Sequence, residues 1–332
     1  MSALQVGISG CDEAALRTLA AVAAHADCAV AALHDPEPAR LAAARARCSA
    51  QIATEDFQTF LASGVDFVVL GGSLADRQER LAAANAQAVP CLLRAPLATD
   101  LATAQAMAAG SEALGLRLGL VVPGQDDPLL DQLRRMVADD WLGALVAVQA
   151  IAGDDERLLH PHEPRAHPLL ERVAPLLHLT TWVCGKRPFE VTAQAVAGYG
   201  ADDDSVVATA RLRGGALATF HGSHTTKAHA IALHGTDGGL RLAGDRLWLR
   251  GKRAYRGNVF AYEHPGDEVV LDRTDLAAAI AANSPELEPL GSFARWLDDT
   301  DDFACPAEQA LEDLRGIAAM QRSLASGARE RV

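Results

Sequence analysis

The chain has 332 residues, of which 49% are hydrophobic, 22% are charged and only 5% are aromatic. This apolar fraction supports a sizeable buried core and excludes a disordered chain, while the length favours two domains. With 30 basic and 43 acidic residues the formal net charge is −13, which excludes nucleic acid and anionic membranes as expected partners.

Three further features indicate where the protein works. The longest apolar stretches, such as 65–72, are too short to span a bilayer. The opening sequence MSALQVGISG has no basic start and predicts a strand rather than a signal peptide. The cysteines, at 11, 28, 48, 91, 184 and 305, form no CxxC pair, which is typical of reduced thiols. We therefore expect a cytoplasmic protein.

The first 122 residues alternate apolar runs with helical stretches. The runs predict strands at 5–9, 28–34, 67–71, 90–93 and 116–122. Helices are predicted at 13–26, 36–48 and 101–114, and another follows the 67–71 strand and ends at about residue 88. Asp35 is expected to cap the second helix, with Pro36 at its first position. Near-continuously apolar strands between helices indicate a parallel sheet covered on both faces. Residues 1–122 are therefore predicted to form a doubly wound, Rossmann-like α/β domain.

The pattern changes after Pro123. Helices are predicted at 128–139, 169–183 and 307–326, while 189–250 consists of β-like runs separated by turns. Gly214-Gly215 between two of these runs indicates a hairpin. Consecutive strands joined by tight turns predict a mostly antiparallel sheet. Residues 123–332 are therefore predicted to form an α+β domain with one large sheet.

This order of elements resembles the glucose–fructose oxidoreductase/inositol dehydrogenase (Gfo/Idh/MocA) family over nearly the whole chain. The motifs that carry the resemblance are VGISGC at 6–11, Asp35-Pro36, FVVL with its loop at 67–73, RAP at 94–96, LLHLTTWVCGKRP at 176–188 and HGTDGGLRL at 234–242. The resemblance implies an NAD or NADP cofactor and oxidation of a sugar or cyclitol hydroxyl. It also implies a second domain for substrate binding and for homo-oligomer assembly through the large sheet. A catalytic lysine and a His-x-x-Asp unit are expected to handle the proton.

The phosphate loop departs from the G-x-G-x-x-G fingerprint, because only its first glycine, Gly10, is present. The sequence continues with Cys11 and Asp12, and Ala15 at the last position is a mild change. Asp12, with Glu13 beside it, adds negative charge where a pyrophosphate approaches the loop, which predicts weak dinucleotide binding. The alternative is that Asp12 simply caps the following helix.

Two other positions bear on the cofactor. Asp35 lies close to where the fold places an acid for the ribose hydroxyls, which favours NAD over NADP, although Arg40 one turn later weakens that preference. A helix-capping role for Asp35 is compatible with this one. In the loop after FVVL, Gly71, Gly72 and Ser73 stand where the family usually shows Thr-Pro-Asn, and Asp76 stands where it has a histidine. Backbone contacts to a ribose and a simple turn are both open here.

The proton-handling groups are the most altered. Ala95 takes the place of the family's lysine, between Arg94 and the retained Pro96. Arg94 is a candidate catalytic residue by position, but a guanidinium that stays protonated is a poor acid or base. His178 matches the family's histidine, and Thr181 replaces its aspartate. His178 and Thr181 are therefore candidate catalytic residues, and a buried core histidine is the alternative for His178.

A histidine-rich loop precedes the helix that carries the candidate histidine. The sequence HPHEPRAH contains His160, His162, Glu163, Arg165 and His167. Because its spacing fits no zinc pattern, we expect a loop that faces substrate or a partner, and no metal site.

Two hypotheses follow for the function. In the first, the dehydrogenase chemistry is lost, and the protein is a binding, regulatory or assembly component that takes a small-molecule ligand. In the second, it is an active NAD(P)-dependent oxidoreductase with an acid–base group recruited from His178, Asp76 or the 160–167 loop. Losing a general acid or base typically lowers a rate by about 10²–10⁴-fold. Because the lysine, the aspartate and two glycines are absent together, the sequence favours the first hypothesis.

Overall fold

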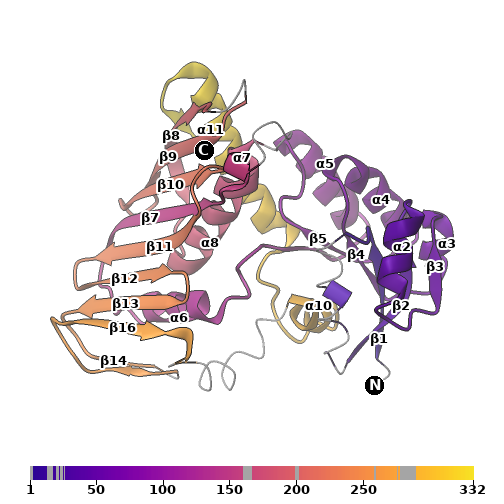
Figure 1. Ribbon diagram of the computed structural model, residues 1–332, viewed down its shortest axis with the longest axis horizontal. Helices are drawn as coiled ribbons and strands as arrows, with labels where there is room; N and C mark the ends of the chain where they lie inside the picture. Colours follow the sequence, from indigo (N-terminus) through magenta and orange to yellow (C-terminus); the bar gives the residue numbers. More distant parts are fainter. Residues whose placement is uncertain are drawn as a thin grey trace. The chain divides into compact units, whose positions relative to one another are not determined.

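The computed structural model describes residues 3–12, 18–19, 22, 25, 27–159, 167–198, 202–257, 259–274, 276 and 289–332. The chain forms two compact units, one of Met1–Val122 with Glu288–Leu311 and one of Pro123–Leu287 with Glu312–Val332 (Figure 1). The chain thus passes between units at the predicted boundary, while 288–311 belongs to the first unit. Most of the predicted helix at 13–26 and the 160–166 part of the histidine-rich loop lie outside the described residues.

The N-terminal unit contains a parallel six-stranded sheet in the order β3-β2-β1-β4-β5-β6. Its strands are β1 (Leu4–Ser9), β2 (Cys28–His34), β3 (Ile52–Thr54), β4 (Phe67–Leu70), β5 (Cys91–Arg94) and β6 (Leu118–Val121). Its described helices include α2 (Pro38–Arg45), α3 (Phe57–Leu61), α4 (Leu74–Ala86), α5 (Leu101–Glu112) and α10 (Pro289–Leu297). The predicted Rossmann-like domain is confirmed, and the strand order reverses between β1 and β4.

The helix after β2 begins later than the sequence indicated. Pro38, not Pro36, occupies its first turn, and Glu37 is the residue at its N-cap. The predicted cap at Asp35 is therefore wrong, because the Asp35 carboxylate accepts the Glu37 backbone N–H from outside the helix. The short elements β3 and α3, of three and five residues, were not predicted. Asp56 caps α3 by accepting the N–H groups of Gln58 and Thr59.

The C-terminal unit contains a nine-stranded sheet in the order β16-β13-β12-β11-β7-β10-β9-β8-β17. The strands are β7 (Leu145–Gly153), β8 (Pro188–Val196), β9 (Ser205–Leu212), β10 (Leu217–Ser223), β11 (Ala228–Gly235), β12 (Gly238–Ala243), β13 (Arg246–Gly251), β16 (Glu268–Asp272) and β17 (Glu330–Arg331). Only β7 and β10 pair in parallel; every other neighbouring pair is antiparallel. The predicted mostly antiparallel sheet is confirmed, including the hairpin at Gly214-Gly215. Two short strands, β14 (Tyr255–Arg256) and β15 (Ala261–Tyr262), form a separate antiparallel pair between β13 and β16 in the chain.

Helices of this unit cover one face of the large sheet. They are α6 (Pro128–Ala138), α7 (Glu156–Leu159), the π-helical η1 (Leu169–Val173), α8 (Ala174–Cys184) and α11 (Ala307–Ser326), which starts in the first unit. Gly222 of β10 shows which face is covered, because a Cβ there would lie 2.8 Å from the Val173 side chain of η1. Pro175 has no N–H to donate to the preceding turn, which explains why the predicted single helix is π-helical before α8. Among the described helices, none is long and apolar enough to cross a membrane.

Candidate functional site

The carboxyl ends of β1 and β4 lie side by side where the strand order reverses, and doubly wound folds bind their ligands at such a point. Gly10 follows β1 with a φ of +84°, and a Cβ built on it would lie 2.6 Å from the backbone nitrogen of Gly72. Glycine is therefore required at position 10 for both conformation and space. The loops after β1 and β4 therefore pack backbone against backbone at this edge of the sheet.

Asp35 ties the first of these loops to the end of β2. Its side chain is buried, and Oδ2 accepts the Cys11 N–H at 2.6 Å while Oδ1 accepts the Glu37 N–H at 2.8 Å. Arg40 adds an ion pair, with its Nε 3.3 Å from Oδ1. Burial, and then the charge of Asp35, raise the pKa of the Cys11 thiol to about 12, so the thiol stays protonated at neutral pH. Both oxygens of Asp35 thus bind backbone groups, and its contact with a ribose stays a prediction.

Arg77 of α4 forms hydrogen bonds with the turn at residues 94–96, which contains Ala95 in place of the family's lysine. Its Nη1 donates to the carbonyls of Arg94 at 2.6 Å and Pro96 at 3.1 Å, and its Nη2 donates to the Gly72 carbonyl at 3.4 Å. Burial, and then the charge of Arg94, lower the pKa of Arg77 to about 10. The Ala95-Pro96 peptide is cis, and the Ala95 N–H donates to the Val121 carbonyl of β6. The predicted residues of this turn are therefore brought to the same edge of the sheet as Gly72.

Ser73 and Asp76 have a local structural role. Ser73 is the N-cap of α4, where its Oγ accepts the Asp76 N–H at 3.3 Å and donates to Asp76 Oδ2 at 2.8 Å. The Asp76 side chain is exposed and lies 3.6 Å from Nη2 of Arg80. Arg77 and Arg80 were not singled out from the sequence. The sequence pattern that could have identified them is a pair of arginines three residues apart, in the first turns of a helix that follows a buried strand.

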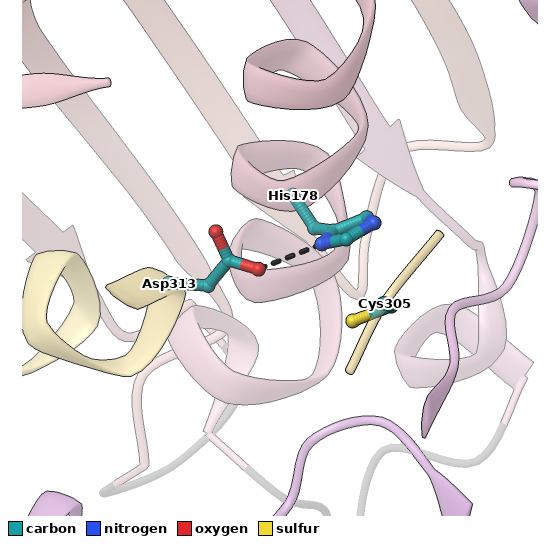
Figure 2. Close-up of side chains that lie close together, drawn as sticks. All are labelled: His178, Cys305 and Asp313. Carbon is teal, nitrogen blue, oxygen red and sulfur yellow. Dashed lines mark hydrogen bonds and ion pairs between the residues drawn. The ribbon is translucent and has the colours of Figure 1, made fainter. Parts of the chain in front are cut away.

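His178 has a carboxylate partner that the sequence did not reveal. It lies on α8, is buried, and its Nδ1 is 2.7 Å from Oδ2 of Asp313 on α11 (Figure 2). Thr181, which replaces the family's aspartate, instead donates its hydroxyl to the His178 carbonyl at 2.9 Å. The structure thus brings together a histidine and an aspartate from two different helices of the C-terminal unit.

The pairing has a chemical consequence for the ring. An imidazole that donates Nδ1–H to a carboxylate carries its lone pair on Nε2, and the carboxylate stabilises the imidazolium that forms when Nε2 takes a proton. A His–Asp pair of this kind is suited to general acid–base catalysis.

Several ion pairs, one of them fully buried, lie elsewhere in the C-terminal unit, next to the histidine-rich loop. Arg157 of α7 and Asp204 form an ion pair of 2.5 Å, with side chains 5% and 2% exposed. His224, which follows β10, lies 3.4 Å from a carboxylate oxygen of Glu171. His167 at the end of the loop is 3.1 Å from Asp203. These contacts involve residues before and after the 160–166 segment, which itself lies outside the described residues.

Comparisons with known proteins agree with this architecture. Together, the fold and the site define a two-domain α/β protein with a Rossmann-like unit. Residues 130–241 match the family described as the GFO/IDH/MocA C-terminal domain. The chain carries that domain, and the family resemblance seen in the sequence is confirmed. A search of curated proteins found none that matches.

Several solved structures share the fold over their whole length. An oxidoreductase from Agrobacterium radiobacter, in complex with NAD+, L-tartaric acid and magnesium, is 17% identical with a TM-score of 0.84, over 99% of this chain and 98% of that one. The WlbA dehydrogenase from Bordetella pertussis, in complex with NADH and UDP-GlcNAcA, is 18% identical with a TM-score of 0.81, over 100% and 98%. A myo-inositol dehydrogenase assigned in Sinorhizobium meliloti 1021 is 17% identical with a TM-score of 0.79, over 99% of both chains.

Replacing Asp12 by glycine is expected to strengthen dinucleotide binding about tenfold, since a repulsion of that size corresponds to about 1.4 kcal/mol. The measurement is a calorimetric titration with NAD and NADP, and Asp66→Gly on the opposite, amino-terminal side of β4 is the control for net charge. If the unmodified protein binds NAD or NADP with a dissociation constant of about 1 μM, the expected repulsion is contradicted.

Proposed function

We propose that the protein is an NAD(P)-dependent oxidoreductase that acts on a hydroxyl of a sugar, cyclitol or similar small polyol. The observation that carries this proposal is the 2.7 Å contact between His178 and Asp313, because it restores a histidine–carboxylate pair that the sequence alone counted as lost. Solved structures with the same fold contain NAD+ or NADH, which supports the cofactor class.

The N-terminal unit has groups suited to the cofactor. The residues that would hold it are those at the carboxyl edge of the parallel sheet, namely Gly10, Cys11, Asp12, Asp35, Arg40, Gly72, Ser73 and Pro96. The fit rests on the close backbone contact at Gly10 and Gly72, and on the buried Nη1 of Arg80, which has no hydrogen-bond partner among the described residues. Asp12 opposes the fit, so we expect NAD or NADP to bind weakly.

The chain's own part in the reaction is the movement of a proton. A nicotinamide dinucleotide, when bound, supplies the acceptor for the hydride of the carbon that bears the hydroxyl. His178 takes the hydroxyl proton on Nε2, and Asp313 orients the ring and stabilises the imidazolium. Ala95 contributes no charge, so the proton is handled without the cation that the family's lysine supplies.

A second candidate function is a binding or regulatory component without dehydrogenase activity. The methyl group of Ala95 and the carboxylate of Asp12 favour it, because each removes a feature that the family's chemistry uses. In this case a small-molecule ligand still binds, and the His178–Asp313 pair serves only the stability of the C-terminal unit.

One experiment separates the two functions. The purified protein is titrated with NAD, NADH, NADP and NADPH while its melting temperature is followed, and it is then incubated with a panel of polyols while the absorbance of reduced nicotinamide is recorded. Turnover of any polyol that depends on the dinucleotide supports the oxidoreductase. Absence of turnover across the panel, with a nucleotide or polyol still raising the melting temperature, supports the binding component.

We also propose that the chain forms a homo-oligomer through the large sheet. The side chains on the face away from η1 and α8 include Val207, Leu217 and Val270, which are 47%, 55% and 45% exposed. Replacing Leu217 by arginine should convert the oligomer to monomer in sedimentation velocity, because the charge would be buried in the contact. Leu159→Arg, at an exposed leucine of α7, is the matched control and should leave the mass unchanged. A monomeric unmodified protein would contradict the proposal.

A further inference from the structure

Arg80 lies at the ligand-binding edge of the parallel sheet with part of its charge unsatisfied. Its Nη1 is buried and has no hydrogen-bond partner within the described part of the chain. Its Nη2 lies 3.6 Å from the exposed carboxylate of Asp76, and the whole side chain is 12% exposed. A buried guanidinium nitrogen without a partner costs free energy, so its retention calls for a reason.

The position of this nitrogen is set by the loop after β4. A Cβ built on Gly72 would lie 3.0 Å from Arg80 Nη1, so the guanidinium occupies the space beside the glycine. The charge of Arg80 also acts on His34 at the end of β2, whose pKa is lowered by burial first and by Arg80 second. Arg80 thus lies near the ends of both β2 and β4.

Two more guanidinium groups contribute to the charge at this edge. Arg77 binds the Gly72 carbonyl and has a buried Nε without a hydrogen-bond partner among the described residues. Arg94 is exposed, and its charge reaches Arg77. Among the described residues, the acidic groups that act on these arginines are Asp12, which acts on Arg77, and Asp76, which pairs with Arg80. Within the described part of this edge, three cations therefore stand against two carboxylates.

We propose that Arg80, supported by Arg77, is an anion-binding residue that holds a phosphate group of a nucleotide ligand. The loop after β1 has a carboxylate at Asp12 where a fingerprint glycine stands in dinucleotide-binding folds, so its backbone offers a poorer phosphate site. Arg80 supplies the missing attraction from α4, on the other side of the Gly10–Gly72 contact. This inference deepens the proposed function and rests on it for the identity of the ligand as a dinucleotide, whereas the anion site itself requires only a phosphate.

The test uses the full chain and two simple probes, inorganic pyrophosphate and ADP. Both are expected to raise the melting temperature of the unmodified protein. Arg80→Gln should weaken their binding at least about tenfold, the size of one charge-assisted hydrogen bond. Without ligand the variant should melt at the same or a higher temperature, because a buried unpartnered nitrogen is removed. Arg45→Gln, an exposed arginine of α2, changes the net charge equally and should bind both probes like the unmodified protein.

The outcomes are separable from those of the proposed function. No response of the unmodified protein to either probe, or equal binding by Arg80→Gln and Arg45→Gln, would overturn the anion site. If Arg80→Gln fails to fold, Arg80→Lys replaces it, because lysine keeps the charge and should retain part of the binding of both probes. A folded Arg80→Lys protein that binds neither probe would also count against the anion site. If the probes bind in a way that depends on Arg80 but no polyol is turned over, the proposed oxidoreductase function is contradicted and the anion site is supported.

Discussion

Replacing His178 by asparagine is expected to lower kcat/KM for polyol oxidation by about 10²–10⁴-fold, the usual effect of losing a general acid or base. The reason is that Nδ1 of His178 lies 2.7 Å from the half-buried carboxylate of Asp313, which leaves Nε2 of the ring to take the proton. The dissociation constant for the dinucleotide should change little. Absorbance of the reduced nicotinamide measures the rate, and calorimetry measures the binding.

Asp313→Asn tests whether the carboxylate works through the ring. An amide in this place leaves the imidazole able to take the wrong tautomer, so we expect kcat to fall by between about 10-fold and the roughly 10⁴-fold seen when a Ser-His-Asp triad loses its aspartate. KM should stay unchanged, because Asp313 contacts the histidine and not the substrate. If His178→Asn changes the melting temperature but not the rate, His178 is a core histidine without a part in the reaction.

The largest expected loss of stability comes from breaking the buried ion pair of the C-terminal unit. Arg157→Met leaves the carboxylate of Asp204 buried, which typically costs about 3–5 kcal/mol of unfolding free energy. Asp204 also accepts the Gly198 N–H at 2.7 Å, and its carbonyl accepts the His224 N–H at 2.9 Å, so a displaced Asp204 disturbs two chain segments. Urea denaturation followed by tryptophan fluorescence gives the free energy.

Two comparisons make this result specific. The double variant Arg157→Met/Asp204→Leu removes both charges and should recover most of the loss, since no isolated charge stays buried. Arg256→Met breaks an exposed pair with Glu263, whose partners are 77% and 57% exposed, and should change the free energy by no more than about 1 kcal/mol. Equal effects of Arg157→Met and Arg256→Met would show that burial of the pair is irrelevant.

The sequence was a good guide to elements that are long or strongly apolar. The strands at 28–34 and 67–70 and the helix at 307–326 follow from local composition, because an apolar run of that length has to be buried in a regular element. The elements β3 and α3 were missed because three or five residues carry too little periodicity. The displaced start of α2 reflects two candidate prolines, Pro36 and Pro38, between which local rules do not decide.

The candidate site was harder to predict, because its decisive contacts are not local. The partner of His178 is 135 positions away in sequence, on a helix that the sequence identified but gave no reason to connect with α8. Substitution of the family's aspartate by Thr181 therefore suggested a histidine without a carboxylate neighbour, whereas Asp313 lies beside it. Arg80 was missed for a different reason: its importance depends on the burial of one nitrogen, which composition does not reveal.

The origin of the His178–Asp313 pair has a consequence for the order in which the protein matures on the ribosome. The chain is made from its N-terminus, so α8 and the strands from β8 to β16 emerge before the helix that supplies the carboxylate. Domains fold as units during synthesis, and until α11 docks, α8 carries His178 without Asp313. The His178–Asp313 pair is therefore completed late, and amide exchange in α11, rather than in the sheet, should report when it forms in a newly made molecule.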